Sequence, residues 1–149
     1  MSQTTGQMTS KHSTLEVSTD NVIWTDISCS AVAFEPNPGP HMTGSGHVFC
    51  EPLPLVGIGN IEATESTVKI MYTEIESEAT DLIEGFVTNQ TPVYLRWRPK
   101  GAGAGHWEWV EYGFFTTQPV PAGDSDSGDL LTVEVPFFGV GLVMQQQAT

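Results

Sequence analysis

The 149-residue chain has few basic residues, few cysteines and no long apolar run. Five residues are Lys or Arg, against 18 that are Asp or Glu, so the net charge is −13. Such a surface repels nucleic acid, because binding a phosphate backbone requires basic side chains that replace its counterions. Without an apolar run of about 18 residues there is no candidate membrane-spanning helix. The first 13 residues are polar and lack the apolar core of a secretion signal, so we expect synthesis and retention in the cytoplasm, with no membrane partner.

The only two cysteines, Cys29 and Cys50, fit no CxxC pattern. Together with His41 and His47 they supply four groups of the kind that bind zinc, although the close ligand pairs of most zinc sites are missing. A Cys29–Cys50 disulfide is a second alternative, which a reducing cytoplasm disfavours. Two ordinary thiols are the interpretation that we favour.

Other motifs give little evidence of chemistry. Ser45 and His47 lie close in sequence, but no oxyanion-hole motif accompanies them. The acidic run at 124–129 resembles the start of a calcium loop, yet its Gly128 is fifth rather than sixth and Val135 stands where the loop needs Glu. The sequence therefore predicts no enzyme activity, no cofactor, and no catalytic or metal site.

Alternating apolar residues predict several short strands, at 15–18, 22–34, 65–74, 91–99, 106–117 and 131–138. One segment has helical spacing instead, with an apolar stripe from Ile75 to Val87 and acidic residues outside it. Across a hairpin at 99–105, Arg96 and Arg98 could pair with Glu108 or Glu111, for about 0.2–1 kcal/mol each.

These elements predict a mainly β fold: an antiparallel β-sandwich or part-barrel with one α-helix packed against it. We expect one β-rich domain over 14–138, between a flexible N-terminal arm (1–13) and a flexible C-terminal tail (139–149). Ten Pro and Gly residues interrupt 35–60, which is therefore interpreted as a long loop. Loops of this length in small domains are usually functional or disordered.

The order of four segments resembles the major tail tube proteins of siphophages, the long-tailed phages with non-contractile tails. The segments are VSTDNVIWTDIS, ESTVKIMYTE, EATDLIEGFVTNQTPVYLRWRP and PVPAGDSDSGDLLTVEVPFF. The resemblance covers about residues 14–138. It concerns the order of the segments and their residue patterns rather than an invariant motif. It implies a structural virion protein whose hexameric rings stack into a hollow tube, in the virion tail after assembly in the host cytoplasm. The implied partners are other copies, the tape measure, tail terminator and tail tip proteins, and double-stranded DNA in transit.

An acidic lumen would let DNA slide without sticking. The polar positions of the last strands provide the lumen-lining candidates, Glu108, Glu111 and Glu134. Self-assembly is expected to use the segment 35–60, between rings or subunits. Its candidate residues are Asn37, Pro38, Gly39, Pro40, His41, Met42, Gly44 and Gly46. Two alternatives remain: a capsid decoration or head–tail connector protein, and a small metal-binding β domain.

Overall fold

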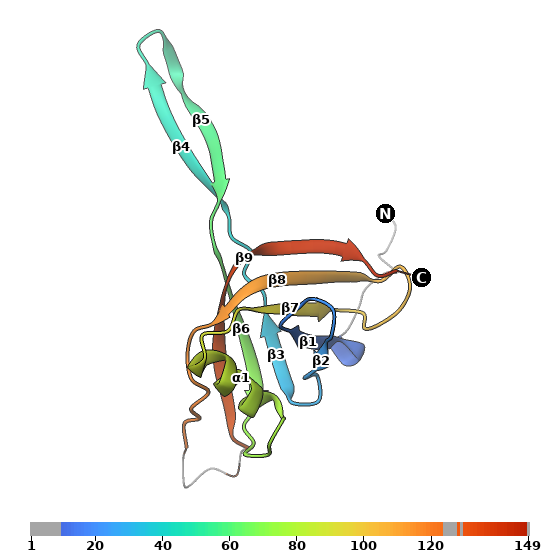
Figure 1. The fold of residues 1–149 in the computed structure, drawn as a ribbon. Helices are drawn as coiled ribbons and strands as arrows, with labels where there is room; N and C mark the ends of the chain where they lie inside the picture. The colour runs from blue at the N-terminus through green and yellow to red at the C-terminus, as the bar shows by residue number, and fades with distance from the viewer. Residues whose placement is uncertain (1–9, 124–127, 129, 149) are drawn as a thin grey trace.

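The computed structural model describes residues 10–123, 128 and 130–148, and it is built mainly of antiparallel β-strands with one α-helix (Figure 1). The predicted fold class is confirmed. The elements in chain order are η1 (Ser10–His12), β1 (Thr14–Ser18), β2 (Thr25–Asp26), β3 (Ala31–Glu35), β4 (His41–Val48), β5 (Glu51–Ile61), β6 (Thr64–Met71), α1 (Ala79–Thr88), β7 (Val93–Arg98), β8 (Trp107–Phe115) and β9 (Thr132–Gln146).

Seven strands form one curled sheet in the order β2-β1-β7-β8-β9-β6-β3, and β4 pairs only with β5. Strand β9 belongs to both halves of the large sheet. Its residues 132–139 pair with β6, and its residues 137–146 pair with β8. Figure 1 shows β9 turning as it passes from one half to the other. The sheet therefore curls around an interior that α1 covers on one side.

Strict alternation places the core on one face of the sheet. Val68 and Ile70 on β6, and Val135 and Phe137 on β9, are all fully buried. The residues between them point to the opposite face, as the period of two in a strand requires. Predicted alternation is therefore confirmed in β6, β7 and the first half of β9.

The helix is shorter than its apolar stripe suggested. Ile83 is buried against the sheet, and the Phe86 ring stacks on Phe115 with centroids 6.4 Å apart. Ile75 lies before the helix and is 62% exposed, so it does not belong to the packed stripe. Asp81 accepts a hydrogen bond from the Ser77 backbone N–H, an acidic contact in the first turn that suits the helix dipole.

The interpretation of 35–60 as a loop is wrong for most of its length. Strands β4 and β5 form a long hairpin that projects from the body (Figure 1). In a two-stranded ribbon each strand has one open edge. Proline lacks a backbone donor, so it is tolerated there although it would break a central strand. Register shifts between His41 and Thr43, and between Gly46 and Val48, absorb the irregular spacing.

The prediction of a flexible C-terminal tail is also corrected. The tail is not loose, because β9 continues to Gln146 and pairs with β8 throughout that stretch. Gln147 then fixes the hairpin loop between β7 and β8, since its side chain donates to the Gly101 carbonyl and accepts from the Gly103 N–H. Ser13 donates to the Pro99 carbonyl at 2.6 Å. Residues 1–9 of the predicted flexible N-terminal segment lie outside the described residues.

Replacing Ile83 by Ala should lower the free energy of unfolding by about 2–5 kcal/mol, because it leaves a cavity beneath the helix. The matched control is Ile75→Ala, which removes the same atoms from an exposed site and should change stability by less than about 0.5 kcal/mol. Urea denaturation followed by circular dichroism measures both. Equal losses would show that the helix does not pack as described.

Candidate functional site

The β4–β5 hairpin, here called the arm, exposes apolar side chains instead of burying them. Every residue from His41 to Ile61 whose side chain is described is exposed. Eight of them are large and apolar: Met42, Val48, Phe49, Leu53, Leu55, Val56, Ile58 and Ile61. Folded monomers rarely expose apolar side chains in such number, and surfaces of this kind usually mark a contact with another molecule. The arm is therefore the first candidate interaction surface.

The base of the arm is narrow and held by hydrogen bonds. The Glu62 N–H donates to the Pro40 carbonyl at 2.9 Å, and the Glu65 N–H donates to the Asn37 carbonyl at 3.3 Å. Gly39 faces the other leg so closely that an added Cβ would lie 1.9 Å from the Glu62 carbonyl oxygen. Only glycine fits at this crossing, so the two legs leave the body together.

The predicted assembly residues all lie on one leg of the arm. Asn37, Pro38, Gly39 and Pro40 lead from β3 to the arm, and His41, Met42, Gly44 and Gly46 lie on β4. The apolar residues of β5, such as Val56 and Ile58, were missed because their Gly- and Pro-rich surroundings concealed a strand. Their β-branched side chains at alternate positions were the signal that could have revealed it.

Two of the three predicted lumen-lining residues are buried. Glu111 is fully buried on the core face, and Glu108 is 5% exposed. Neither carboxyl can line a bore in this chain, so both assignments are corrected. The pleat explains Glu111, since it alternates with Trp109 and Gly113 on the inward face of β8. Glu134 is exposed, as a lining residue must be.

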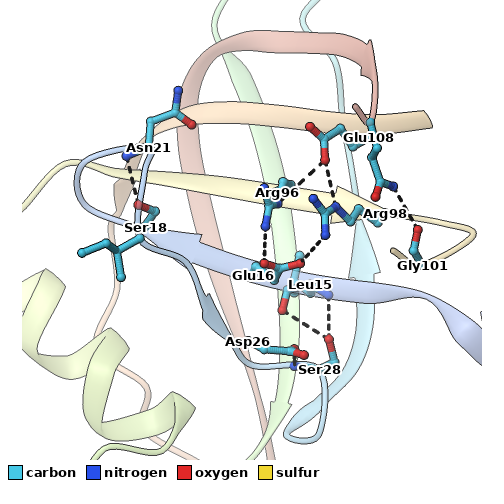
Figure 2. Close-up of polar contacts among 12 residues, drawn as sticks. Leu15, Glu16, Ser18, Asn21, Asp26, Ser28, Arg96, Arg98, Gly101 and Glu108 are labelled. Atoms are coloured by element: carbon cyan, nitrogen blue, oxygen red, sulfur yellow. Dashed lines mark hydrogen bonds and ion pairs between the residues drawn. The ribbon is translucent and has the colours of Figure 1, made fainter. Parts of the chain in front are cut away.

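Glu108 instead belongs to an ion-pair network with Glu16, Arg96 and Arg98 on the face opposite the core (Figure 2). The Arg98 Nε donates to Glu108 at 2.8 Å, and its Nη1 donates to Glu16 at 3.2 Å. Arg96 also donates to Glu16 and lies 4.1 Å from the ring centroid of Trp24. The predicted pairing of the arginines with Glu108 is confirmed, and the pairing with Glu111 is wrong.

This network is electrically neutral, because two guanidinium groups face two carboxylates. Burial of Glu108 opposes its ionisation, but hydrogen bonds from Arg98 and Gln145 and the positive charges of the two arginines outweigh burial and lower its pKa. The sequence alone offers no sign of Glu16 in this network, since only the pairing of β1 with β7 brings it opposite Arg96.

A second exposed apolar surface lies on this outer face of β8 and β9. Phe114 pairs with Phe138 across the two strands, and both rings are almost half exposed. Val140 and Val143 extend the surface along β9. We call these four residues, with Tyr112, the aromatic row. The arm and the aromatic row are different surfaces, so a contact between them would be heterologous.

Acidic residues gather on the outer face of the other half of the sheet. Register places Glu35 beside Thr67, Glu65 beside Phe138, and Glu134 beside Lys69. All three glutamates are exposed. With Lys69 as the only basic residue on the described strands of this half, the face is negative.

The described residues give no support to metal chemistry. Among them, no group of three or more His, Cys, Asp or Glu side chains lies close enough to hold a metal ion. Cys29 precedes β3 and Cys50 lies at the tip of the arm, and both thiols are exposed and unbonded. Most of the acidic run at 124–129, which resembles only the start of a calcium loop, lies outside the described residues. No helix in the described part of the chain has the length and apolar character needed to cross a membrane.

No protein-family model matches this chain, and no curated protein is significantly similar to it in sequence. Solved structures do share its fold. A chain of the PVC sheath–tube complex, from an extracellular contractile injection system in the extended state, has a TM-score of 0.73 and 14% identity, over 96% of this chain and 94% of that one. The cap that terminates the tube of the anti-feeding prophage gives 0.70 and 10%, over 99% and 96%. The SPP1 tail tube gives 0.65 and 9%, over 96% and 81%. The chain therefore has a fold found in tubes and tube caps of injection systems and phage tails.

Replacing Glu108 by Gln should lower stability at neutral pH by about 1–3 kcal/mol, because a buried charge-assisted hydrogen bond is lost. The folded-state pKa of Glu108 is lowered, so its stabilisation is complete above the unfolded-state pKa and disappears as pH falls through the lower value. The difference between variant and wild type should therefore shrink in acid. Glu134→Gln, on the same sheet but exposed, is the control and should change little. A pH-independent difference would contradict the network.

Proposed function

We propose that this chain is a structural subunit of a phage tail or injection-system tube, and not an enzyme. Its copies form rings, hexameric as the sequence resemblance implies, and the rings stack into a hollow tube in the virion tail. The observation that carries this proposal is the arm, which projects from the body (Figure 1) and leaves its apolar side chains exposed in the single chain. The shared fold of tube and cap proteins supports it.

Each copy also has free strand edges that could join a ring. Strand β3 ends the sheet on one side, and β9 beyond Gly139 pairs with β8 alone among the described strands. Free edges in a soluble protein need to be covered. A head-to-tail contact between two different surfaces closes into a ring when the rotation allows it. In this proposal the free edges of β3 and β9 pair between subunits and close the ring. The arm makes the contact between rings or neighbouring subunits, and it binds the aromatic row of another copy.

The bore is lined by the negative outer face of β3, β6 and β9, so that Glu134 is retained as a lining residue and Glu35 and Glu65 replace the two buried ones. A negative lining would keep double-stranded DNA from adhering during passage. Partners in such a tail are the tape measure, tail terminator and tail tip proteins, and assembly takes place in the host cytoplasm.

A terminating ring is the second candidate. The cap of the anti-feeding prophage and the terminator of the PVC sheath and tube both superpose with a TM-score of 0.70. A terminator would form single rings rather than tubes. Negative-stain electron microscopy of concentrated protein distinguishes the two outcomes, and a monomer at high concentration would refute both.

The double variant Val56→Ser, Ile58→Ser should abolish tubes while leaving the body folded, because the two side chains are about three-quarters exposed in the single chain. The control is Val22→Ser, Ile23→Ser, which changes equally exposed residues in the turn before β2. Circular dichroism checks the fold, and electron microscopy with sedimentation counts tubes. Normal tubes from the arm variant would overturn the proposal.

Replacing Glu35, Glu65 and Glu134 by Lys should make assembled tubes retain short DNA duplexes within the bore at low salt, where screening is weakest. Retained DNA is measured as the fraction protected from nuclease. The control replaces Glu74 and Glu76, exposed before the helix, and Glu84, exposed on it, and so gives the same change of charge elsewhere. DNA bound outside the tube remains open to nuclease. Equal protection in both variants would show that the first three residues do not line the bore.

A further inference from the structure

Glu111 is a buried carboxyl that none of the proposed surfaces uses. It is fully buried, and both of its oxygens accept hydrogen bonds from hydroxyl groups on β6. The Thr64 hydroxyl donates to one oxygen, and the Ser66 hydroxyl donates to the other at 2.8 Å. Removing a carboxyl group from water costs free energy, which hydrogen bonds from two side chains offset only in part.

Among the residues that the structure describes, no charged group faces this carboxyl. On β6 it meets Thr64 and Ser66, on β7 it lies beside Leu95, and on β9 it lies beside Leu142 and Gly139. The charged residues of the surrounding elements point to the outer face or are exposed on the helix; they are Glu65, Lys69, Asp81, Glu84, Arg96, Arg98, Glu108 and Glu134. Burial raises the pKa of Glu111, and the two hydroxyl groups offset this only in part.

The hydroxyl groups that Glu111 holds form the base of the arm. Thr64 begins β6 directly after the arm ends at Ile61, so it stands at the foot of one leg. Ser66, which donates to Glu111, also accepts a hydrogen bond from the Asn37 N–H at 3.4 Å, and Asn37 stands at the foot of the other leg. One buried side chain is therefore connected to both legs.

The bend of the sheet places Glu111 where this connection is possible. An added Cβ at Gly139 would lie 2.7 Å from the Glu111 Oε1 and 2.9 Å from the Thr64 hydroxyl. The absence of a side chain at this position leaves the space that the carboxyl occupies. An apolar side chain of similar volume would fill that space, but it would leave both hydroxyl groups and the foot of the arm without their partner.

We propose that Glu111 is a positioning residue for the arm: through Thr64 and Ser66 it fixes the direction in which the arm leaves the body. This inference rests on the proposed function only in that a fixed direction matters for reaching a second copy. The direction itself is a property of the single chain and can be measured without assembly.

The two exposed thiols allow that measurement on the natural chain. Cys29 lies on the body and Cys50 at the tip of the arm, and they are the only cysteines in the sequence. Nitroxide labels on both report the distribution of distances between body and tip by pulsed electron paramagnetic resonance. The labelled protein is diluted with unlabelled protein so that distances between copies do not contribute.

Glu111→Leu should keep the β-sheet signal in circular dichroism but lose the narrow distance peak of the wild type. Glu111→Gln, which has the shape of the neutral acid and can still bond to both hydroxyl groups, should keep it. The stability of the wild type should fall as pH rises from the ordinary pKa of a glutamate to the raised pKa of Glu111, because the unfolded chain releases this proton first, and the Gln variant should lack this fall. Ile70→Ala controls for lost stability, because it truncates a core side chain on β6, the strand that carries Thr64 and Ser66. It should lower the melting temperature and keep the narrow peak.

A narrow peak in Glu111→Leu would overturn the inference, and so would equal broadening in Ile70→Ala, which would show a general loss of stability. The experiments distinguish failure of the positioning role of Glu111 from failure of the proposed function. If the peak broadens in Glu111→Leu but tubes form as in the wild type, the positioning role stands and the role of the arm in assembly falls. If the Val56→Ser, Ile58→Ser variant loses its tubes while Glu111→Leu keeps a narrow peak, the role of the arm in assembly stands and the positioning role of Glu111 falls.

Discussion

The close approach of β8 and β9 at Gly113 and Gly139 is the constraint on which the rest of the structure depends. An added Cβ on Gly113 would lie 2.0 Å from the Phe138 carbonyl oxygen, so only glycine permits this contact. Between these paired glycines and the Glu111–Leu142 pair, β9 contributes one residue more than β8, and Gly141 has a φ of +127°. Such a bulge bends a strand and increases its twist. The bend lets β9 leave β6 and continue along β8, which closes the sheet around its core.

Curling divides the charged residues between two environments. Arg96 and Arg98, two of the five basic residues, are bound to Glu16 and Glu108 in a neutral, largely buried network. The other acids therefore have only three lysines to balance them. The network thus contributes nothing to the net charge of −13, and copies of the chain must bury apolar surface to overcome their mutual repulsion.

The arm offers that apolar surface, and it is poorly supported without a partner. A two-stranded hairpin is at best marginally stable alone in water, because neither face is covered. Its legs are tied together at Gly39 and to the body through Thr64 and Ser66, so the base is ordered while the tip depends on its own ladder of hydrogen bonds. A partner that covers the arm would stabilise its folded form by mass action. Assembly would therefore add stability to the arm, whose direction the base already fixes in the single chain.

Local pattern in the sequence determined the fold class, the helix, most strands and the pairing of the arginines with Glu108, since alternation and turn residues depend on near neighbours alone. The arm and the second half of β9 were hidden, because Pro, Gly and Gln disfavour strands locally and only pairing with a partner strand compensates for them. Which carboxyls are buried was decided by the tertiary structure. Alternation along β8 places Glu111 on the core face, and the pairing of β1 with β7 places Glu16 beside Arg96. The second placement depends on long-range register, which leaves no trace in the spacing of residues along the chain.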